Sequence, residues 1–219
     1  MKAIRITQHG GPQVLRLEEL PTPKPGLSQL LVRLDAAGVN FIDVYQRTGQ
    51  YKVPLPYVMG LEGAGVVEAV GTGVSDFAAG ARVAWTGVPG SYATHAIVPA
   101  DRAVPLPPGL EGRAGAAAML QGVTAHYLSH STYPLKVGDT CLVHAAAGGV
   151  GLLLTQMAKL RGARVLATVS TQEKAKLARR AGADEVILYA DKDFAQAARR
   201  LTRGAGVQVV YDSVGRDTF

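Results

Sequence analysis

The chain has 219 residues, of which 47% are hydrophobic and 18% charged, a balance that supports about two folded domains and excludes intrinsic disorder. Its single cysteine, Cys141, excludes a disulfide framework and a four-cysteine zinc site. It also favours a reducing compartment, so we expect a cytoplasmic protein. The net charge of +6 is concentrated in residues 159–219, where it permits nucleic-acid binding or attraction of a small polyphosphate.

Residues 1–120 predict a β-rich domain. Short apolar or alternating runs recur there, and proline and glycine interrupt them, which is typical of strands joined by turns. The clearest runs are 1–6, 30–34, 65–70 and 81–85. A proline-rich segment at 105–109 precedes a change of pattern, so we place a domain boundary near residue 120 and a second domain at 121–219.

Residues 121–219 predict strands that alternate with helices, the pattern of a parallel, doubly wound α/β sheet. We expect strands at 141–145, 164–169, 185–188 and 207–211, and helices at 150–161, 172–181 and 194–202. A six-stranded dinucleotide fold needs two more strands, yet the sequence stops eight residues after the fourth. We therefore expect a truncated sheet, either because the chain is a fragment or because something else covers the open edge.

A glycine-rich turn joins the first strand and the first helix of this second domain. The segment Ala146-Ala147-Gly148-Gly149-Val150-Gly151 matches Gly-x-Gly-x-x-Gly with alanine in the first place. Such glycines let the chain turn tightly, let backbone approach a pyrophosphate and let the helix pack on the sheet, while the helix N-terminus favours negative charge. The motif alone is a weak signal, but its place between a strand and a helix predicts a dinucleotide site.

The end of the second strand indicates which dinucleotide binds. An acidic residue there would hold the ribose hydroxyls of NAD, but the sequence is Thr168-Val169-Ser170-Thr171. Ser170 can donate a hydrogen bond, and Lys174 can supply positive charge, to a 2′-phosphate. We therefore expect NADPH. The alternative is that Lys174 is one more solvated helix residue, and the neighbouring Glu173 is an objection to the phosphate site.

The sequence contains no pattern typical of a metal site, of an activated catalytic nucleophile or of a membrane-spanning helix. None of the five histidines lies at zinc spacing from the cysteine, and His126 and His130, four apart on an expected helix, are too few ligands for a metal site. Gly-x-Ser-x-Gly and Tyr-x-x-x-Lys are absent, so an enzyme would rely on its cofactor. His144 is expected in the core rather than as a base. The uncharged stretch 140–158 contains three glycines, so we expect no membrane helix.

Four segments, taken in order, carry a more specific signal. They are 38–45 (Gly-Val-Asn-Phe-Ile-Asp-Val-Tyr), 60–65 (Gly-Leu-Glu-Gly-Ala-Gly), 144–151 and 209–215 (Val-Val-Tyr-Asp-Ser-Val-Gly). Together they resemble the zinc-independent quinone oxidoreductases of the medium-chain dehydrogenase/reductase superfamily. Zinc-dependent relatives have cysteine in the place of Asn40 and histidine in the place of Leu61, and neither ligand is present here.

This resemblance implies a fold and a set of site residues. It implies a GroES-like domain at 1–120, incomplete without a C-terminal segment, and a Rossmann NADPH-binding domain at 121–219 with about four strands. Cofactor contacts on the nicotinamide side would fall on Asn40, Asp43, Tyr45 and Tyr127. The glycine turn would contribute Gly148, Gly149, Val150 and Gly151. The 2′-phosphate side would fall on Ser170, Thr171, Lys174 and Tyr189, with a further contact at Ser213.

The function we infer is NADPH-dependent reduction of a quinone or a conjugated enone without zinc. Hydrogen-bond donors must then meet the charge on the acceptor oxygen, and the candidates are Asn40, Tyr45 and Tyr51, or water. The alternatives are an inactive fragment and an NADPH-binding structural or RNA-binding protein with little turnover. Aromatic residues make up only 6% of the chain, which leaves few platforms for base stacking, so we do not expect nucleic-acid binding. The resemblance suggests a homodimer.

Overall fold

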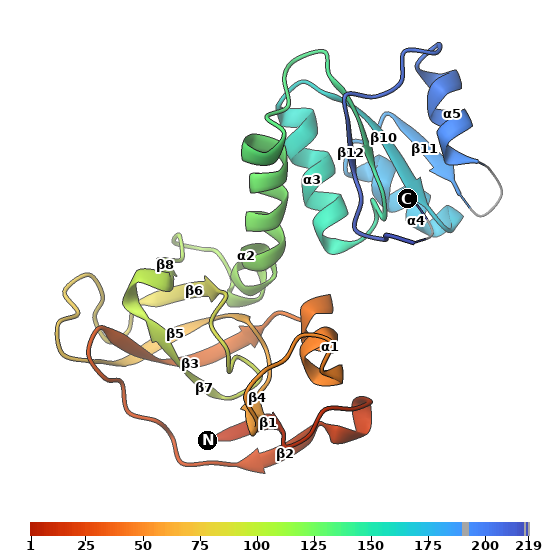
Figure 1. Cartoon of the computed structure of the whole chain (residues 1–219). Coiled ribbons are helices and arrows are strands. Elements are labelled where there is room, and N and C mark those ends of the chain that lie inside the picture. The colour runs from red at the N-terminus through yellow and green to blue at the C-terminus, as the bar shows by residue number, and fades with distance from the viewer. Residues whose placement is uncertain (190–192, 217, 219) are drawn as a thin grey trace. The chain divides into compact units, whose positions relative to one another are not determined.

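A computed structural model describes residues 1–189, 193–216 and 218 (Figure 1). The chain divides into two compact units, Met1–Leu120 and Gln121–Phe219. Each unit has a hydrophobic core of its own: Trp85 and Val32 lie in that of the first unit, and Val143 and Val165 lie in that of the second. None of the described helices is both long and apolar enough to cross a membrane.

The strands of the first unit form two antiparallel sheets, which agrees with the predicted β-rich domain. One sheet has five strands in the order β7-β3-β5-β6-β8, and the other has three in the order β2-β1-β4. Their bounds are β1 Lys2–Ile6, β2 Arg16–Glu19, β3 Gln29–Ala37, β4 Tyr57–Val58, β5 Glu62–Val70, β6 Arg82–Thr86, β7 His95–Pro99 and β8 Ala103–Pro105. The centre of the larger sheet is β5, which pairs with β3 on one side and β6 on the other.

A helix interrupts these strands, so the expectation of purely β structure up to residue 120 is wrong at this point. The helix α1 (Phe41–Thr48) begins after Asn40 and ends at Gly49, whose φ of +83° lies in the left-handed region that glycine adopts freely. Eight residues are too few for a helical period to stand out among strands. The other helices that begin in this unit are the 3-10 helices η1 (Pro12–Val14) and η2 (Ala100–Arg102) and the α-helix α2 (Gly112–Tyr127).

Four parallel strands form the sheet of the second unit, in the order β11-β10-β9-β12. Their bounds are β9 Thr140–Val143, β10 Arg164–Val169, β11 Glu185–Leu188 and β12 Val209–Tyr211. The helices between them are α3 Gly149–Leu160, α4 Gln172–Arg180 and α5 Phe194–Leu201. Each predicted strand and helix is present with its ends within two residues, which confirms the doubly wound α/β prediction.

Helices cover both faces of this sheet (Figure 1). Because successive residues of a strand point to opposite faces, Val143 packs on one face with Leu154 of α3 and Ala178 of α4. On the other face, Leu166 packs with Ala197 of α5. A π-helix, η3 (Leu128–Thr132), follows α2. The expected single helix through His126 and His130 therefore changes its winding between them, and their rings stack with centroids 4.1 Å apart.

The single cysteine lies on β9, inside the core of the second unit. Cys141 has no exposed surface and its thiol is free. Burial raises the pKa of this thiol to about 12, because the thiolate would lose its hydration in the apolar core. Cys141 is therefore protonated at neutral pH, and it serves the packing of the sheet.

Candidate active site

The N-terminus of α1 holds two of the predicted site residues in a buried polar network. Asn40 and Asp43 are 8% and 5% exposed. Asp43 Oδ2 accepts a hydrogen bond from Asn40 N at 2.8 Å and another from the hydroxyl of Tyr92 at 2.7 Å. Burial, together with the bond to Asp43, raises the pKa of Tyr92, so its phenol remains a donor. The network therefore fixes the first turn of α1 and the backbone of Asn40.

A buried glutamate holds the side chain of Asn40. Glu62, the first residue of β5, has no exposed surface. Its Oε1 accepts from Asn40 Nδ2 at 2.7 Å, and its Oε2 accepts from Leu120 N at 2.6 Å. Burial raises the pKa of Glu62, while these two bonds oppose the rise by stabilising the carboxylate. A Cβ on Gly38 would collide with this carboxylate, so the glycine leaves the room that Glu62 occupies.

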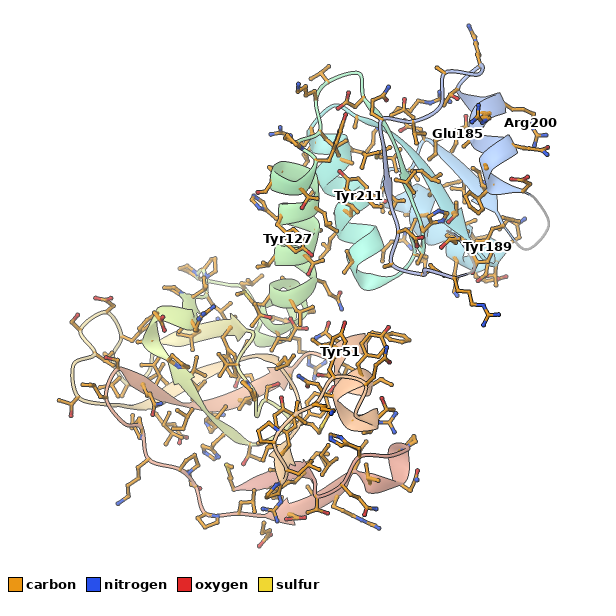
Figure 2. All side chains as sticks on the ribbon, viewed as in Figure 1. Tyr51, Tyr127, Glu185, Tyr189, Arg200 and Tyr211 are labelled. Carbon is orange, nitrogen blue, oxygen red and sulfur yellow. The ribbon has the colours of Figure 1, made fainter. Side chains whose placement is uncertain are left out.

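Three aromatic rings lie in a row along α1 and just after it. The centroids of Phe41 and Tyr45 are 5.6 Å apart in an edge-to-face arrangement, and those of Tyr45 and Tyr51 are 5.3 Å apart. Phe41 and Tyr51 are largely exposed, and Figure 2 labels Tyr51 beside α1. The row offers aromatic surface and two phenol hydroxyls, and two of its rings lie on the helix that begins after Asn40.

The predicted glycine turn lies between β9 and α3, with Gly148 as the N-cap of the helix. Ala145, just before the motif, has a φ of +49°, a left-handed conformation that costs a residue with a Cβ roughly 1–2 kcal/mol. A Cβ on Gly151 would collide with the carbonyl of Ala145 and would lie 2.6 Å from Ala146 Cα. Backbone therefore packs against backbone here, and no side chain among the described residues fills the space at the start of α3 next to Gly151.

Ser170 and Lys174 lie together at the carboxyl end of β10, the strand that pairs with β9. Lys174 Nζ donates to Ser170 Oγ at 3.1 Å, and Thr171 caps α4 by accepting from Lys174 N at 3.3 Å. Glu173 is exposed, and hydrogen bonds from its own backbone and from Thr171 lower the pKa of its carboxyl. The structure thus brings the predicted serine and lysine into contact, with one carboxylate nearby.

A cavity of about 220 Å³ lies where the strand order reverses, between β9 and β12. Ligands of doubly wound sheets bind at such a switch point, beyond the carboxyl ends of the strands. Val150, Gly151 and Ser213, all predicted cofactor contacts, are among its lining residues. Tyr211, labelled in Figure 2, closes another part of the wall, and its hydroxyl donates to the carbonyl of Leu128 at 3.4 Å.

His144 is a packed residue, as expected. It is 2% exposed, its Nδ1 lies 2.7 Å from Thr168 Oγ1, and its ring meets Phe194 edge to face with centroids 4.8 Å apart. Burial lowers the pKa of the imidazole, although Asp212 opposes this shift. The ring is therefore neutral at physiological pH.

Two predicted contacts lie apart from these groups. Tyr127, the last residue of α2, is 47% exposed. Tyr189 follows β11 and is 39% exposed, and its backbone N donates to Val169 O at 3.3 Å. Figure 2 labels both tyrosines. Tyr189 therefore lies one strand away from Ser170, at the same end of the sheet.

The sequence analysis missed three residues that support the predicted ones. Glu62 and Tyr92 hold Asn40 and Asp43, and the side chain of Gln121 packs so closely on Gly149 that a Cβ there would collide with it. The one local signal for Glu62 was that it is an acidic residue next to Leu61, which is buried. The partners of Tyr92 and Gln121 are far away in the sequence, so no local pattern identifies them.

Metal ligands are not gathered in the part of the chain that the structure describes: no group of three or more His, Cys, Asp or Glu side chains could hold an ion. Residues 26–108 match the family model of the alcohol dehydrogenase GroES-like domain, and residues 149–219 match that of the zinc-binding dehydrogenases. The position that the resemblance aligns with a zinc-binding cysteine holds Asn40, whose amide is bound to Glu62.

Known proteins are similar to this chain over its whole length. A quinone oxidoreductase of Pseudomonas aeruginosa is 46% identical over 220 residues, which are 100% of this chain and 68% of the relative. A 2-haloacrylate reductase of a Burkholderia species is 44% identical, over 98% of this chain and 66% of the relative. The crystal structure of Escherichia coli quinone oxidoreductase complexed with NADPH superimposes with a TM-score of 0.97 at 43% identity, over 100% of this chain and 68% of that one.

The chain thus spans about two thirds of the length of the relatives that it matches. Within that span, one family model matches a range in the first unit and the other a range in the second. The chain belongs to the quinone oxidoreductase family of the medium-chain dehydrogenases/reductases.

Proposed function

We propose that the protein is an NADPH-dependent reductase that transfers a hydride to a quinone or to a conjugated carbonyl compound. The observation that carries this proposal is the Ser170–Lys174 pair beside the glycine turn. Because β9 and β10 are neighbours, the pyrophosphate-binding turn and an anion-binding pair lie at the ends of adjacent strands. A dinucleotide with an additional phosphate on its adenosine ribose presents its charges in that order.

The residues present fit this cofactor. Gly148, Gly149, Val150 and Gly151 would face the pyrophosphate, since the close approach at Gly151 keeps the turn free of side-chain bulk. We assign Ser170, Thr171, Lys174 and Tyr189 to the 2′-phosphate side and Ser213 to a further contact in the cavity. Asn40, Asp43, Tyr45 and Tyr127 are assigned to the nicotinamide side. The NADPH-bound relative from Escherichia coli supports the choice of cofactor.

The acceptor would be reduced without a metal ligand set, by the chain's own hydrogen-bond donors. NADPH, when bound, supplies the hydride and its electron pair. Negative charge then develops on the acceptor oxygen, and the amide of Asn40 and the hydroxyls of Tyr45 and Tyr51 are the donors that α1 and the following loop provide. The aromatic row that contains both tyrosines suits a planar acceptor. The family relatives act on quinones and on a 2-haloacrylate by name.

We further propose a cytoplasmic homodimer. The free, buried thiol of Cys141 suits a reducing compartment. Sedimentation velocity on the full chain tests the dimer, which predicts one species of about twice the chain's mass.

Calorimetric titration with NADPH and, separately, with NADH tests the cofactor assignment. The wild-type chain should bind NADPH at least about 10-fold more tightly, because a phosphate beside a lysine gains a charge-assisted hydrogen bond. Lys174→Met should remove most of that preference and leave NADH binding unchanged. Lys176→Met is the matched control, since Lys176 is exposed on the same helix. Equal affinity of the wild-type chain for both dinucleotides would contradict the proposal.

A further inference from the structure

Glu62 has no direct part in the proposed reaction, but it contacts and holds Asn40, which has one. We propose that Glu62 is the positioning residue of the Asn40 carboxamide: it accepts one N–H of Nδ2 and thereby fixes the direction of the other N–H of the same nitrogen, the donor of the proposed function. This inference rests on the proposed function of Asn40 as a donor.

The orientation follows from the chemistry of the two side chains. An ionised carboxylate only accepts hydrogen bonds, whereas a carboxamide has a donating end and an accepting end. Asn40 Nδ2 lies 2.7 Å from Glu62 Oε1. Rotating the amide by half a turn would bring its carbonyl oxygen against a carboxylate oxygen of Glu62, which has no exposed surface, so the repulsion would be poorly screened. Glu62 therefore fixes the amide in one of its two orientations.

Glu62 is itself held from two further directions. Its Oε2 accepts from Leu120 N at 2.6 Å, within α2. Gly38 lies so near that a side chain there would occupy the place of the carboxylate. Asp43 meanwhile holds the backbone N of Asn40 at 2.8 Å. Two carboxylates, one on β5 and one on α1, thus secure the side chain and the backbone of the same residue.

A carboxylate suits this place better than any neutral side chain. Both donors, Asn40 Nδ2 and Leu120 N, are neutral, so an ionised glutamate is buried without a compensating charge in these contacts, which is costly. A glutamine of the same shape has only one accepting end. Its amide NH2 would face either Asn40 or Leu120 as a second donor. Only an acceptor at both ends keeps both contacts and the orientation of the Asn40 amide.

The test compares Glu62→Gln with wild type in the full chain. We expect kcat for quinone reduction to fall about 10-fold or more, while KM for the quinone and the Kd for NADPH change less than about 2-fold. Val98→Ala, a cavity-forming change in the core at a residue with no exposed surface, is the control for lost stability. It should leave kcat unchanged. An equal loss of kcat in Val98→Ala, or an unchanged kcat in Glu62→Gln, would overturn the proposal.

A second readout does not depend on activity. The side-chain NH2 of Asn40, identified by its loss in Asn40→Asp, should give a downfield, exchange-protected signal in ¹H–¹⁵N spectra of the wild-type chain. It should lose both properties in Glu62→Gln and in Gly38→Ala, which displaces the carboxylate without removing it. An unchanged signal in both variants would refute the positioning role. If the wild-type chain reduces no quinone or enone, the proposed function fails, but this NMR comparison still decides what Glu62 does.

Discussion

The two units prepare their candidate site residues in opposite ways. In the first unit, side chains position the site residue: Glu62, Asp43 and Tyr92 form a buried network that holds Asn40, with hydrogen bonds of 2.6–2.8 Å. In the second unit, the backbone shapes the candidate site, because Gly151 lets α3 begin in close contact with the end of β9, while Thr171, Lys174 and Ser213 are exposed. The first arrangement fixes the direction of the Asn40 amide, whereas the second keeps the start of α3 free of side-chain bulk.

The difference predicts which kind of substitution disrupts the candidate site of each unit. A site made of buried polar contacts loses stability when one acceptor is removed, since the remaining donors are left unpaired. A site made of backbone loses its shape when any side chain is added. Substitutions in both units test this difference.

Gly151→Ala should have the largest effect. Its Cβ would collide with the carbonyl of Ala145 and with Ala146 Cα, and neither backbone atom can move aside without disturbing β9. We expect a loss of about 3 kcal/mol in the free energy of unfolding, the upper part of the range for overpacking, and loss of measurable NADPH binding. Urea denaturation and calorimetry measure the two effects.

Gly149→Ala is the matched comparison for Gly151→Ala. The new Cβ would meet the flexible end of Gln121 rather than backbone, so the loss should be smaller by at least 1 kcal/mol or so. Equal losses in the two variants would contradict the claim that Gly151 faces backbone, whereas Gly149 faces a movable side chain.

Asp43→Asn should have the next largest effect, now in the first unit. Asp43 Oδ2 accepts from both Asn40 N and the Tyr92 hydroxyl, and an amide oxygen replaces a carboxylate in both bonds. We expect a loss of about 1.5–3 kcal/mol in the free energy of unfolding, the value for hydrogen bonds to a charged group. Tyr92→Phe removes only one of the two bonds, so it should cost less. A larger cost for Tyr92→Phe would show that the phenol has another partner.

The burial of His144 predicts that the free energy of unfolding of the second unit depends on pH. Burial lowers the pKa of the folded imidazole below its unfolded value of about 6.5. The unfolded chain therefore binds the proton more readily, so the free energy of unfolding should fall as the pH drops below about 6.5. In His144→Gln this part of the pH dependence should vanish. The exposed His126→Gln is the control and should retain it.

Tyr45→Phe and Tyr51→Phe should have the smallest effects, with kcat reduced less than about 5-fold in each single variant. Either hydroxyl can be replaced by the other or by water as a donor to the acceptor oxygen, and a released quinol exchanges protons with solvent. Steady-state turnover with a quinone measures this. A loss of about 100-fold or more in one variant alone would identify that phenol as the required acid.

The second unit was predictable from sequence because its signals are local. Buried strands such as 164–169 alternate with helices of clear period, and the residues of the glycine turn stand side by side in the chain. Only the ends of the elements differ. The end of the strand predicted at 141–145 lies two residues earlier, at Val143. The chain leaves the strand there because Ala145 adopts a left-handed conformation, which is rare for alanine and has no local sequence signal.

The polar network of the first unit was not predictable in the same way. Asn40 and Glu62 are 22 positions apart, and Asp43 and Tyr92 are 49 apart. Their pairing depends on how β5 and the segment before β7 lie against α1, which no periodicity encodes. The resemblance identified Asn40 and Asp43 as site residues, but the residues that hold them became visible only through the long-range contacts.

The burial of Cys141 has a consequence for the durability of the catalyst. Quinones and enones are electrophiles that alkylate thiols, and the attacking species is the thiolate. The chain's single cysteine is sealed in the core, with its thiol pKa raised to about 12. A reductase with this arrangement can turn over reactive acceptors repeatedly without being covalently inactivated by them at sulfur.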